Sequence, residues 1–374
     1  MLSRLKFDLS QIINEQFTYF PNYIWESKTT TFCDLQMAAG QYIKEVVNKL
    51  REFGHSDENI KSRVFGFSEN EFYLAVIQGD SSLIGTFNVY RENIDMKFDV
   101  QVGNDPYQTS NIGDKKTHAI WHKHLQKRIT LLNDGGFLGL IHPSAWRNVD
   151  GDFKETQELI KSKKLLFLKM HGYKEGRELF GAQINFDMYV LQNSPSDNYE
   201  TKIVHENGTI THRDLSNLEF IPSDNIDEIM KFVAKPGEET VNVLYSSSDY
   251  EIRYSHMNKE KTNEFKYPCV YTINKGSNIN FWYSNTNQRG HFGIPKVIWS
   301  NGSATSPIID KNGDFGITQF SYGIIDDIEN LENIQKALSN PRFISDIMLF
   351  KGLANIYNYK IISTFRKDFW KEFI

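Results

Sequence analysis

The chain has 374 residues, of which 40% are hydrophobic and 24% charged, a composition typical of a soluble globular protein with at least two domains. Its two cysteines, Cys33 and Cys269, exclude a disulfide framework and a four-cysteine zinc site. A net charge of −5 argues against polyanion binding over the whole surface, but is compatible with a local basic surface. No apolar run reaches the roughly 18 residues of a membrane span, and the N-terminal residues lack the apolar core of a signal peptide, so we expect a cytoplasmic protein.

Strand-like and helical segments alternate through the first half of the chain. Helical periodicity is clearest over 41–54, where Ile43, Val46 and Leu50 share one face and Gly54 ends the helix. Helices are also predicted at 70–79 and 118–136, an extended or helical stretch at 152–163, and strands at 29–35, 62–68, 84–90, 97–103, 137–146, 165–173 and 185–193. This alternation predicts an α/β fold with a doubly wound, mostly parallel sheet. In such a sheet the ligand lies beyond the carboxyl ends of the strands.

The sequence changes character near residue 195, where a polar, turn-rich stretch follows the last predicted strand. We therefore predict two domains, 1–195 and 196–374, the second of α+β type. Its strands are expected at 269–276, 280–285, 295–306 and 315–324, its helices at 328–340 and 343–362, and its amphipathic tail, 365–374, packed onto the same domain. Residues 251–374 carry 15 Lys and Arg against 12 Asp and Glu, which leaves a net −8 for the preceding part. This asymmetry is expected if only the second domain contacts phosphate.

The most informative stretch is Asn104-Asp105-Pro106-Tyr107, which directly follows a predicted strand. The Asn104 carboxamide oxygen and the Asp105 carbonyl can accept the two hydrogens of a planar exocyclic amine, and the Tyr107 ring can stack on its heterocycle. Pro106 stiffens the turn. The stretch resembles the Asn-Pro-Pro-Tyr signature of the N6-adenine-specific DNA methyltransferases of restriction–modification systems, with Asp105 in place of the first Pro.

The segment from Asp34 to Tyr42 is similar to the S-adenosylmethionine loop of that family, Asp-Pro-x-x-Gly-x-Gly-x-Phe. Asp34 matches the acidic residue and Gly40 the second glycine, whereas Ala38 stands in place of the first glycine. A glycine in such a loop lets the backbone approach the cofactor closely. The resemblance therefore implies the S-adenosylmethionine-dependent methyltransferase fold, with the cofactor bound against this segment.

Further segments resemble the family in the same order along the chain. Phe20-Pro21 is similar to the Thr-Pro element that covers the cofactor, and 135–146 to a Gly-Gly strand that ends in Pro-Ser-x-Trp. Residues 176–193 are similar to a later turn and strand, in which an aromatic side chain closes on the second face of a flipped base, and Phe180 is the matching position. The resemblance covers about 18–193, and the remaining residues occupy the position of a target-recognition domain.

Besides Ala38, three positions depart from the family pattern. Ser68, followed by Glu69, stands where an acidic residue bonds the ribose hydroxyls, and Thr86 where an Asp lies near the adenine amine of the cofactor. Asp105 can serve through its backbone carbonyl, which any residue supplies, or through a carboxylate that accepts from the amine in a partly desolvated cleft. We favour the carbonyl. These departures are compatible with a divergent active enzyme, which we favour, or with a relative that has lost efficient methyl transfer.

The resemblance predicts a site-specific DNA methyltransferase that transfers a methyl group from S-adenosylmethionine to the N6 amine of a flipped-out adenine. The expected catalytic residues are Asn104, Asp105, Pro106, Tyr107 and Phe180. The expected cofactor-binding residues are Phe20, Pro21, Asp34, Gln36, Ala38, Gly40, Ser68, Glu69 and Thr86. Two alternatives stay open: a catalytically degenerate nucleic-acid-binding or specificity subunit, and a methyltransferase acting on RNA or on a protein glutamine.

The expected partner is double-stranded DNA, in a cleft between the two domains, and a cognate restriction endonuclease is a second expected partner. Arg289, Lys296 and Lys311 lie in a stretch rich in amides and aromatics, and we predict that they contact DNA. His118 and His122 have the i,i+4 spacing of a zinc site but no evident third ligand, so we predict no metal. We expect a bacterial or phage-encoded protein, without a membrane partner, and favour a monomer.

Overall fold

The computed structural model describes residues 8–68, 70–80, 82–83, 87–91, 96–109, 118–148, 151–246, 249–274, 276–300, 306–344 and 359–374. The chain divides into two compact units, Met1–Ile221 and Pro222–Ile374. Each unit has hydrophobic clusters of its own.

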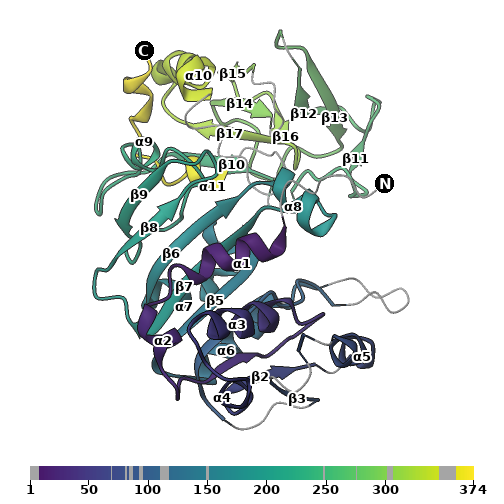
Figure 1. Cartoon of the computed structure of the whole chain (residues 1–374). Coiled ribbons are helices and arrows are strands. Elements are labelled where there is room, and N and C mark those ends of the chain that lie inside the picture. The colour runs from purple at the N-terminus through teal and green to yellow at the C-terminus, as the bar shows by residue number, and fades with distance from the viewer. Residues whose placement is uncertain are drawn as a thin grey trace. The chain divides into compact units, whose positions relative to one another are not determined.

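The first unit is built on a nine-stranded sheet (Figure 1). In spatial order its strands are β3 (Asn88–Tyr90), β2 (Val64–Phe67), β1 (Phe32–Asp34), β4 (Phe98–Gly103), β5 (Leu132–Pro143), β7 (Phe186–Pro195), β6 (Lys163–His171), β8 (Glu200–Val204) and β9 (Ile210–Asp214). Neighbours from β3 to β5 are parallel, whereas β7 is antiparallel to both β5 and β6. The strand order reverses between β1 and β4. This reversal is a topological switch point, where α/β sheets bind their ligands.

Helices connect the strands of the first unit and contact the sheet. They are α1 (Leu9–Phe17), α2 (Asn22–Glu26), α3 (Gln41–Glu52), α4 (Asp57–Lys61), α5 (Glu71–Gly79), α6 (Trp121–Thr130), η1 (Ser144–Arg147), α7 (Lys154–Ser162) and α8 (Tyr173–Phe180). The first three contact one another, α3 contacts β1 and β2, and α1 contacts β7. The predicted apolar face of α3 is confirmed, since Ile43, Val46 and Leu50 are fully buried.

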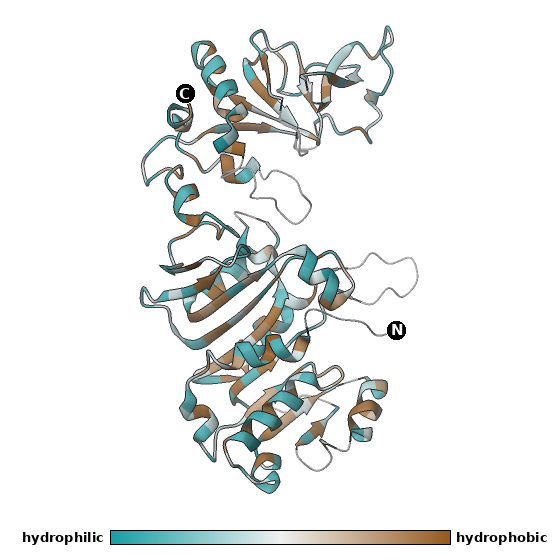
Figure 2. Cartoon of the chain, turned by 45° about the horizontal axis from the view of Figure 1, so that its top comes forward, coloured by the Kyte–Doolittle hydropathy of each residue, from teal (hydrophilic) through white to brown (hydrophobic). Residues whose placement is uncertain are grey.

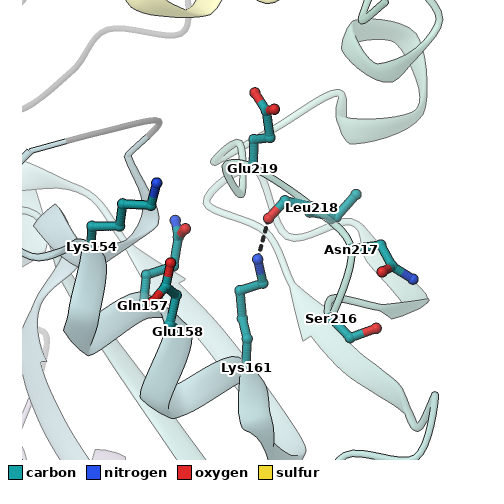
Figure 3. Close-up of a pocket in the computed structure, with 8 residues that line it drawn as sticks. All are labelled: Lys154, Gln157, Glu158, Lys161, Ser216, Asn217, Leu218 and Glu219. Carbon is teal, nitrogen blue, oxygen red and sulfur yellow. Dashed lines mark hydrogen bonds between the residues drawn. The ribbon is translucent and has the colours of Figure 1, made fainter. Parts of the chain in front are cut away.

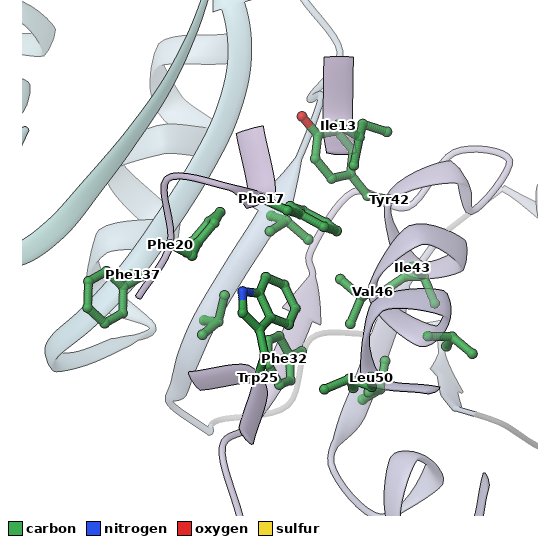
Figure 4. Close-up of a cluster of buried hydrophobic side chains, with 14 of the residues drawn as sticks. Ile13, Phe17, Phe20, Trp25, Phe32, Tyr42, Ile43, Val46, Leu50 and Phe137 are labelled. Atoms are coloured by element: carbon green, nitrogen blue, oxygen red, sulfur yellow. The ribbon is translucent and has the colours of Figure 1, made fainter. Parts of the chain in front are cut away.

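One face of the sheet and helices α1 to α3 enclose the main hydrophobic core, which Figure 4 draws. Aromatic side chains fill much of it: Phe17 packs on Trp25 with ring centroids 5.1 Å apart, and Trp25 stacks on Phe32 at 5.2 Å. On the opposite face Cys33, Phe65 and further side chains of β1, β2 and β4 form a second cluster, which Leu131 at the end of α6 contacts. Burial of both faces explains why these strands are apolar throughout rather than alternating. Figure 2 shows hydrophobic residues along the strands of the large sheet and residues of both kinds on the helices.

The second unit contains two four-stranded sheets. One orders β10 (Asn242–Tyr245), β17 (Ser321–Ile325), β14 (Lys296–Ser300) and β15 (Ile308–Asp310); the other orders β11 (Met257–Asn258), β13 (Ile279–Ser284), β12 (Tyr267–Ile273) and β16 (Gly316–Ile317). Its helices are α9 (Ile226–Met230), η2 (Ile328–Asn330), α10 (Leu331–Ser339), α11 (Tyr359–Ile362) and η4 (Phe369–Glu372). The C-terminal tail packs onto this unit as predicted, since Phe369 and Phe373 contact the ring of Phe343.

The boundary between the units lies later than the predicted position at 195/196. The chain continues from β7 into β8, which pairs parallel with β6, and then into β9, so the first unit ends at Ile221. The predicted helix 118–136 is shorter than expected, because α6 ends at Thr130 and the residues after it begin β5. Parts of the segments predicted at 84–90, 295–306 and 343–362 lie outside the described residues.

A truncation series tests this boundary. A fragment ending at residue 195 loses β8, which exposes the backbone edge of β6 at Phe167–Lys169. We expect the fragment 1–221 to unfold cooperatively on heating, and the fragment 1–195 to aggregate or to melt at least several degrees lower. Circular dichroism melts measure this difference, and equal melting temperatures would show that β8 and β9 are dispensable.

Candidate active site

The carboxyl ends of β1, β2 and β4 meet at a pocket of about 450 Å³. The segments that follow these three strands line it, together with the last residue of α8. The lining residues are Gln36, Met37, Ala38, Ser68, Asn70, Tyr73, Asn104, Asp105, Pro106, Tyr107 and Phe180. The pocket therefore lies at the switch point of the sheet, where the predicted fold class places a ligand.

The turn after β4 presents unsatisfied polar atoms to this pocket. The Asn104 Oδ1 and the Tyr107 hydroxyl are both buried, and neither has a hydrogen-bond partner among the described residues. Burial also raises the pKa of Tyr107, so its hydroxyl stays protonated. Buried polar atoms in folded proteins almost always have a hydrogen-bond partner. Two such atoms without a partner, both in one pocket, therefore indicate a ligand with complementary groups.

The Tyr107 and Phe180 rings both line the pocket but do not lie parallel. Their centroids are 5.8 Å apart and their planes are at 76°, an edge-to-face contact. A base stacked between two parallel rings requires the rings to lie about 7 Å apart, which is the sum of two van der Waals contact distances. In this structure Phe180 therefore closes the space beside Tyr107, and it must move before a base can stack between the two rings.

Beneath the turn after β4, residues 104–107, which the sequence predicts to be the catalytic turn, lies a buried ion-pair cluster. It is centred on Arg128 of α6, which is 1% exposed. Its Nε donates to Asp105 Oδ2 at 2.9 Å, and its Nη2 donates to Asp105 Oδ1 at 2.5 Å and to Asp34 Oδ1 at 3.0 Å. Its Nη1 donates to the carbonyl of Val102 at 3.0 Å. Gly103 makes room for the cluster, because a Cβ there would overlap Nη2 and lie 2.9 Å from Asp34 Oδ1.

The electrostatics of this cluster follow from its burial. Burial raises the pKa of Asp34 to about 6, against the opposing effect of the Arg128 charge. Burial also opposes the charge on Arg128, yet the carboxylates of Asp105 and Asp34 keep its pKa above the ordinary value. A single guanidinium thus serves two carboxylates. Both oxygens of the Asp105 carboxylate already accept hydrogen bonds from Arg128, which favours its backbone carbonyl, rather than its carboxylate, as an acceptor for an amine.

The cofactor loop occupies the predicted place, although not every predicted residue faces the pocket. Gln36 and Ala38 line it, whereas Asp34 lies beneath it and accepts a 3.1 Å hydrogen bond from the Gln36 amide. Gly40 precedes α3 with φ of +79°, and a Cβ there would lie 3.2 Å from Ile77 of α5. Gly40 therefore serves backbone conformation and packing, and it is not among the residues that line the pocket.

Of the other predicted cofactor residues that the structure describes, only Ser68 lines the pocket. The expectation for Phe20-Pro21 is not met: Phe20 is buried in the main core with its ring 6.3 Å from that of Phe137, and Pro21 caps α2. Glu69 and Thr86 lie outside the described residues.

Three pocket residues and one residue below the pocket were missed by the sequence analysis. Met37, Asn70 and Tyr73 line the pocket, and Met37 lies across Gly66, where a Cβ would overlap its sulfur. Asn70 also caps α5 by accepting from the Phe72 amide at 3.0 Å. Arg128 lies in the predicted helix 118–136 but was not among the predicted site residues. The one signal for it was the presence of two acidic residues, Asp34 and Asp105, directly after apolar strands, because such buried carboxylates need a cation.

The structure corrects part of the predicted DNA contact set in the second unit. Lys296 is fully buried, and its Nζ donates to Asp310 Oδ2 at 2.8 Å and to the carbonyl of His291. It holds the β14–β15 pair and cannot reach phosphate. Lys311 is about half exposed but is paired with Glu332 at 3.0 Å. Arg289 is exposed, as a DNA contact requires.

A second pocket of about 310 Å³ lies in the first unit between α7 and the loop after β9 (Figure 3). Lys154, Glu158 and Lys161 on one face of α7 oppose residues 216–219. Lys161 donates to the carbonyl of Leu218, and burial lowers its pKa. Charges of both signs line this pocket, and the Lys161 amine binds the loop through the Leu218 carbonyl. We therefore assign it to loop packing.

Neither a metal centre nor a membrane helix is found in the described part of the chain. No three of its His, Cys, Asp and Glu side chains are grouped so that they could hold a metal ion. None of its helices has both the length and the apolar character needed to cross a bilayer.

The pocket fits S-adenosylmethionine in the chemistry of its lining. Amide and hydroxyl groups of Gln36, Ser68 and Asn70 offer donors and acceptors, and Met37 and Tyr73 offer apolar surface. The buried, unpaired Asn104 Oδ1 lies in the same pocket, on its β4 side. The fold and the site together are those of a methyltransferase.

Comparison with known proteins agrees with this class. Residues 16–175 match the model of the Eco57I restriction-modification methylase family. The match covers less than half of the chain, and it confirms the resemblance found in the sequence, together with the fold and the S-adenosylmethionine cofactor that the resemblance implies. No curated protein is significantly similar to this chain in sequence.

Several solved structures are similar in fold. The type IIG restriction endonuclease BpuSI is 9% identical, with 98% of this chain and 60% of that one covered and a TM-score of 0.48. The type I methyltransferase subunit from Streptococcus thermophilus is 14% identical (53% and 46% covered, TM-score 0.40), and the M protein of the type I enzyme EcoKI is 10% identical (54% and 49%, TM-score 0.41). The chain thus spans between 46% and 60% of the length of these proteins.

The pKa of Asp34 provides a test of the buried cluster. A carboxyl pKa raised from 3.8 to about 6 means that the folded protein holds this proton more tightly than the unfolded chain, so the stability that Asp34 contributes increases as the pH falls through 6. Asp34→Asn lacks this gain. We expect the free energy of unfolding lost on substitution to be about 1 kcal/mol larger at pH 5 than at pH 7. Urea denaturation of both proteins at both pH values measures it, and equal losses would mean that Asp34 does not titrate in this range.

Proposed function

We propose that this protein is a DNA methyltransferase that modifies the N6 amine of adenine. The observation that carries the proposal is the buried Asn104 Oδ1, which has no described partner and shares one pocket with the segment after β1. A carboxamide oxygen in this state needs a donor from a ligand, and an exocyclic amine is a planar donor of suitable geometry. S-adenosylmethionine supplies the electrophilic methyl group.

The residues of the turn hold the amine and do not deprotonate it. Asn104 Oδ1 and the carbonyl of Asp105 accept its two hydrogens, which draws the nitrogen lone pair out of conjugation with the ring. The one carboxylate among the described lining residues, that of Asp105, is bound to Arg128, so the pocket offers the amine no free base. The proton released on methyl transfer then passes to water. Catalysis rests on the positioning of the nitrogen.

Aromatic side chains on the same turn and on α8 hold the base. Tyr107 supplies one stacking face, and Phe180 moves from its edge-to-face contact to cover the other. An adenine can reach these rings only after leaving the base stack, so the proposal includes base flipping, at a cost of a few kcal/mol.

The second unit is proposed to bind the DNA around the target base. This assignment is supported by the net +3 charge of residues 251–374 and by the exposed Arg289. It does not include Lys296, whose amine is fully buried.

The substrate is tested with tritium-labelled cofactor and three acceptors: genomic DNA from cells without adenine methylation, total RNA, and a protein extract. We expect label in DNA, and N6-methyladenine on nucleoside analysis of that DNA. Label in RNA or protein without label in DNA would replace the proposed substrate. Cofactor binding in calorimetry without transfer to any acceptor would indicate a catalytically degenerate relative.

Asn104→Ala tests the role of the amine acceptor. We expect the rate of methyl transfer at saturating cofactor to fall roughly 100- to 1,000-fold, the usual effect of losing one transition-state hydrogen bond, while the cofactor dissociation constant stays unchanged. Single-turnover rates and calorimetry measure the two quantities.

Asn70→Ala is the matched control, because Asn70 lines the same pocket on the β2 side. Its effect should be the converse, a weaker cofactor complex whose transfer rate is restored by excess cofactor. If Asn104→Ala behaves in the same way as Asn70→Ala, Asn104 contacts the cofactor and not the base.

A further inference from the structure

Arg128 bonds to three separate segments around the pocket. Its guanidinium reaches the end of β4 at the Val102 carbonyl, the catalytic turn at the Asp105 carboxylate, and the end of β1 at Asp34. The side chains of all three charged residues are at most 5% exposed. Arg128 itself does not line the pocket. Arg128 can therefore affect the pocket only through the residues to which it is hydrogen-bonded.

Both sides of the pocket depend on this contact. Asp105 is followed by Pro106, whose ring fixes its own backbone, but no ring fixes the backbone of Asp105. Instead, the bidentate contact of the Asp105 carboxylate with Nε and Nη2 of Arg128 restrains the Asp105 backbone. On the other side, Asp34 Oδ1 accepts from both Nη2 and the backbone amide of Gln36, a residue of the pocket lining.

We propose that Arg128 is a positioning residue that fixes the catalytic turn relative to the cofactor loop, and that the Asp105 side chain serves catalysis only through Arg128. The proposal rests on the proposed function for its effect on rate. It departs from the expectation that any residue at position 105 can serve, because any residue supplies the backbone carbonyl. Asp105→Pro removes one of the two carboxylates that the buried guanidinium binds.

The test is a double-mutant cycle on Arg128→Met and Asp105→Asn, with rates and cofactor affinities measured for each variant. If the two residues act as one unit, each single substitution should lower the transfer rate about 100-fold, the usual effect of a small misplacement of reacting groups. The double variant should then be no slower than Arg128→Met alone. Multiplicative losses would mean that the Asp105 carboxylate acts on the substrate separately, which would overturn the proposal.

Arg128→Met leaves two buried carboxylates without a cation, so two further variants accompany it. Arg128→Lys keeps the charge but loses the planar fork, and it should recover cofactor affinity more fully than transfer rate. Arg147→Met is the matched control. Arg147 is also a buried arginine paired with a buried carboxylate, with its Nε 2.9 Å from Asp187 Oδ2, but it lies outside the pocket lining. Arg147→Met should lower the melting temperature without changing the methyl-transfer rate of the protein that remains folded.

Cofactor affinity separates this inference from the proposed function. If the parent protein transfers no methyl group to DNA, the proposed function fails, yet Arg128→Met should still weaken cofactor binding roughly tenfold or more through Asp34 and the loop that Asp34 holds. Unchanged cofactor affinity in folded Arg128→Met would show that Arg128 only stabilises the fold, as Arg147 does, whatever the result with DNA.

Discussion

A single buried guanidinium organises the pocket of this protein. Arg128 enters from α6 and binds carboxylates at the ends of two neighbouring parallel strands. Moving one charge of this kind out of water costs several kcal/mol, and the cost is offset only where counter-charges and hydrogen bonds are well placed. The geometry around Arg128 meets that condition, because the Val102 carbonyl and the two carboxylates take up its donors. Because Asp34 and Asp105 must both reach the Arg128 guanidinium, the carboxyl ends of β1 and β4 are held in fixed positions relative to each other.

The sheet explains why such a cluster occurs at this position. β1 and β4 are adjacent, parallel and on opposite sides of the reversal in strand order, so the chain leaving each of them turns away in a different direction. The space between the diverging chains becomes the pocket, and the side chains directly below it are too deep for water to reach. Asp34 and Asp105 lie at this depth, so their charges have to be balanced by the protein itself.

Much of this architecture could be predicted from the sequence, because it depends on local patterns. The apolar strands that end in Asp34 and Gly103, and the amphipathic helix 41–54, have the periodicity of their secondary structure. The position of the catalytic turn followed from these elements. β8 and β9 were missed because short, polar strands resemble a hinge in sequence, and only the pairing of β8 with β6 and of β9 with β8 reveals them. Phe20 was assigned to function from a resemblance to a family motif and Lys296 from its residue type and neighbours. Packing determines the role of Phe20, and the buried Asp310 determines that of Lys296. The contact of Arg128 with Asp34 joins residues 94 positions apart, which no local pattern encodes.

Gly103 limits which residues can replace the members of the Arg128 cluster during evolution. The space that a Cβ would take at this position is filled by the Arg128 guanidinium and the Asp34 carboxylate. A larger residue at 103 therefore requires a smaller or differently directed side chain at 128, and the loss of the arginine in turn removes the reason for two buried acids. Positions 34, 103, 105 and 128 are thus expected to change together among related chains, as one inherited set, and a homologue that retains only some of the four would have to balance its buried charge in another way.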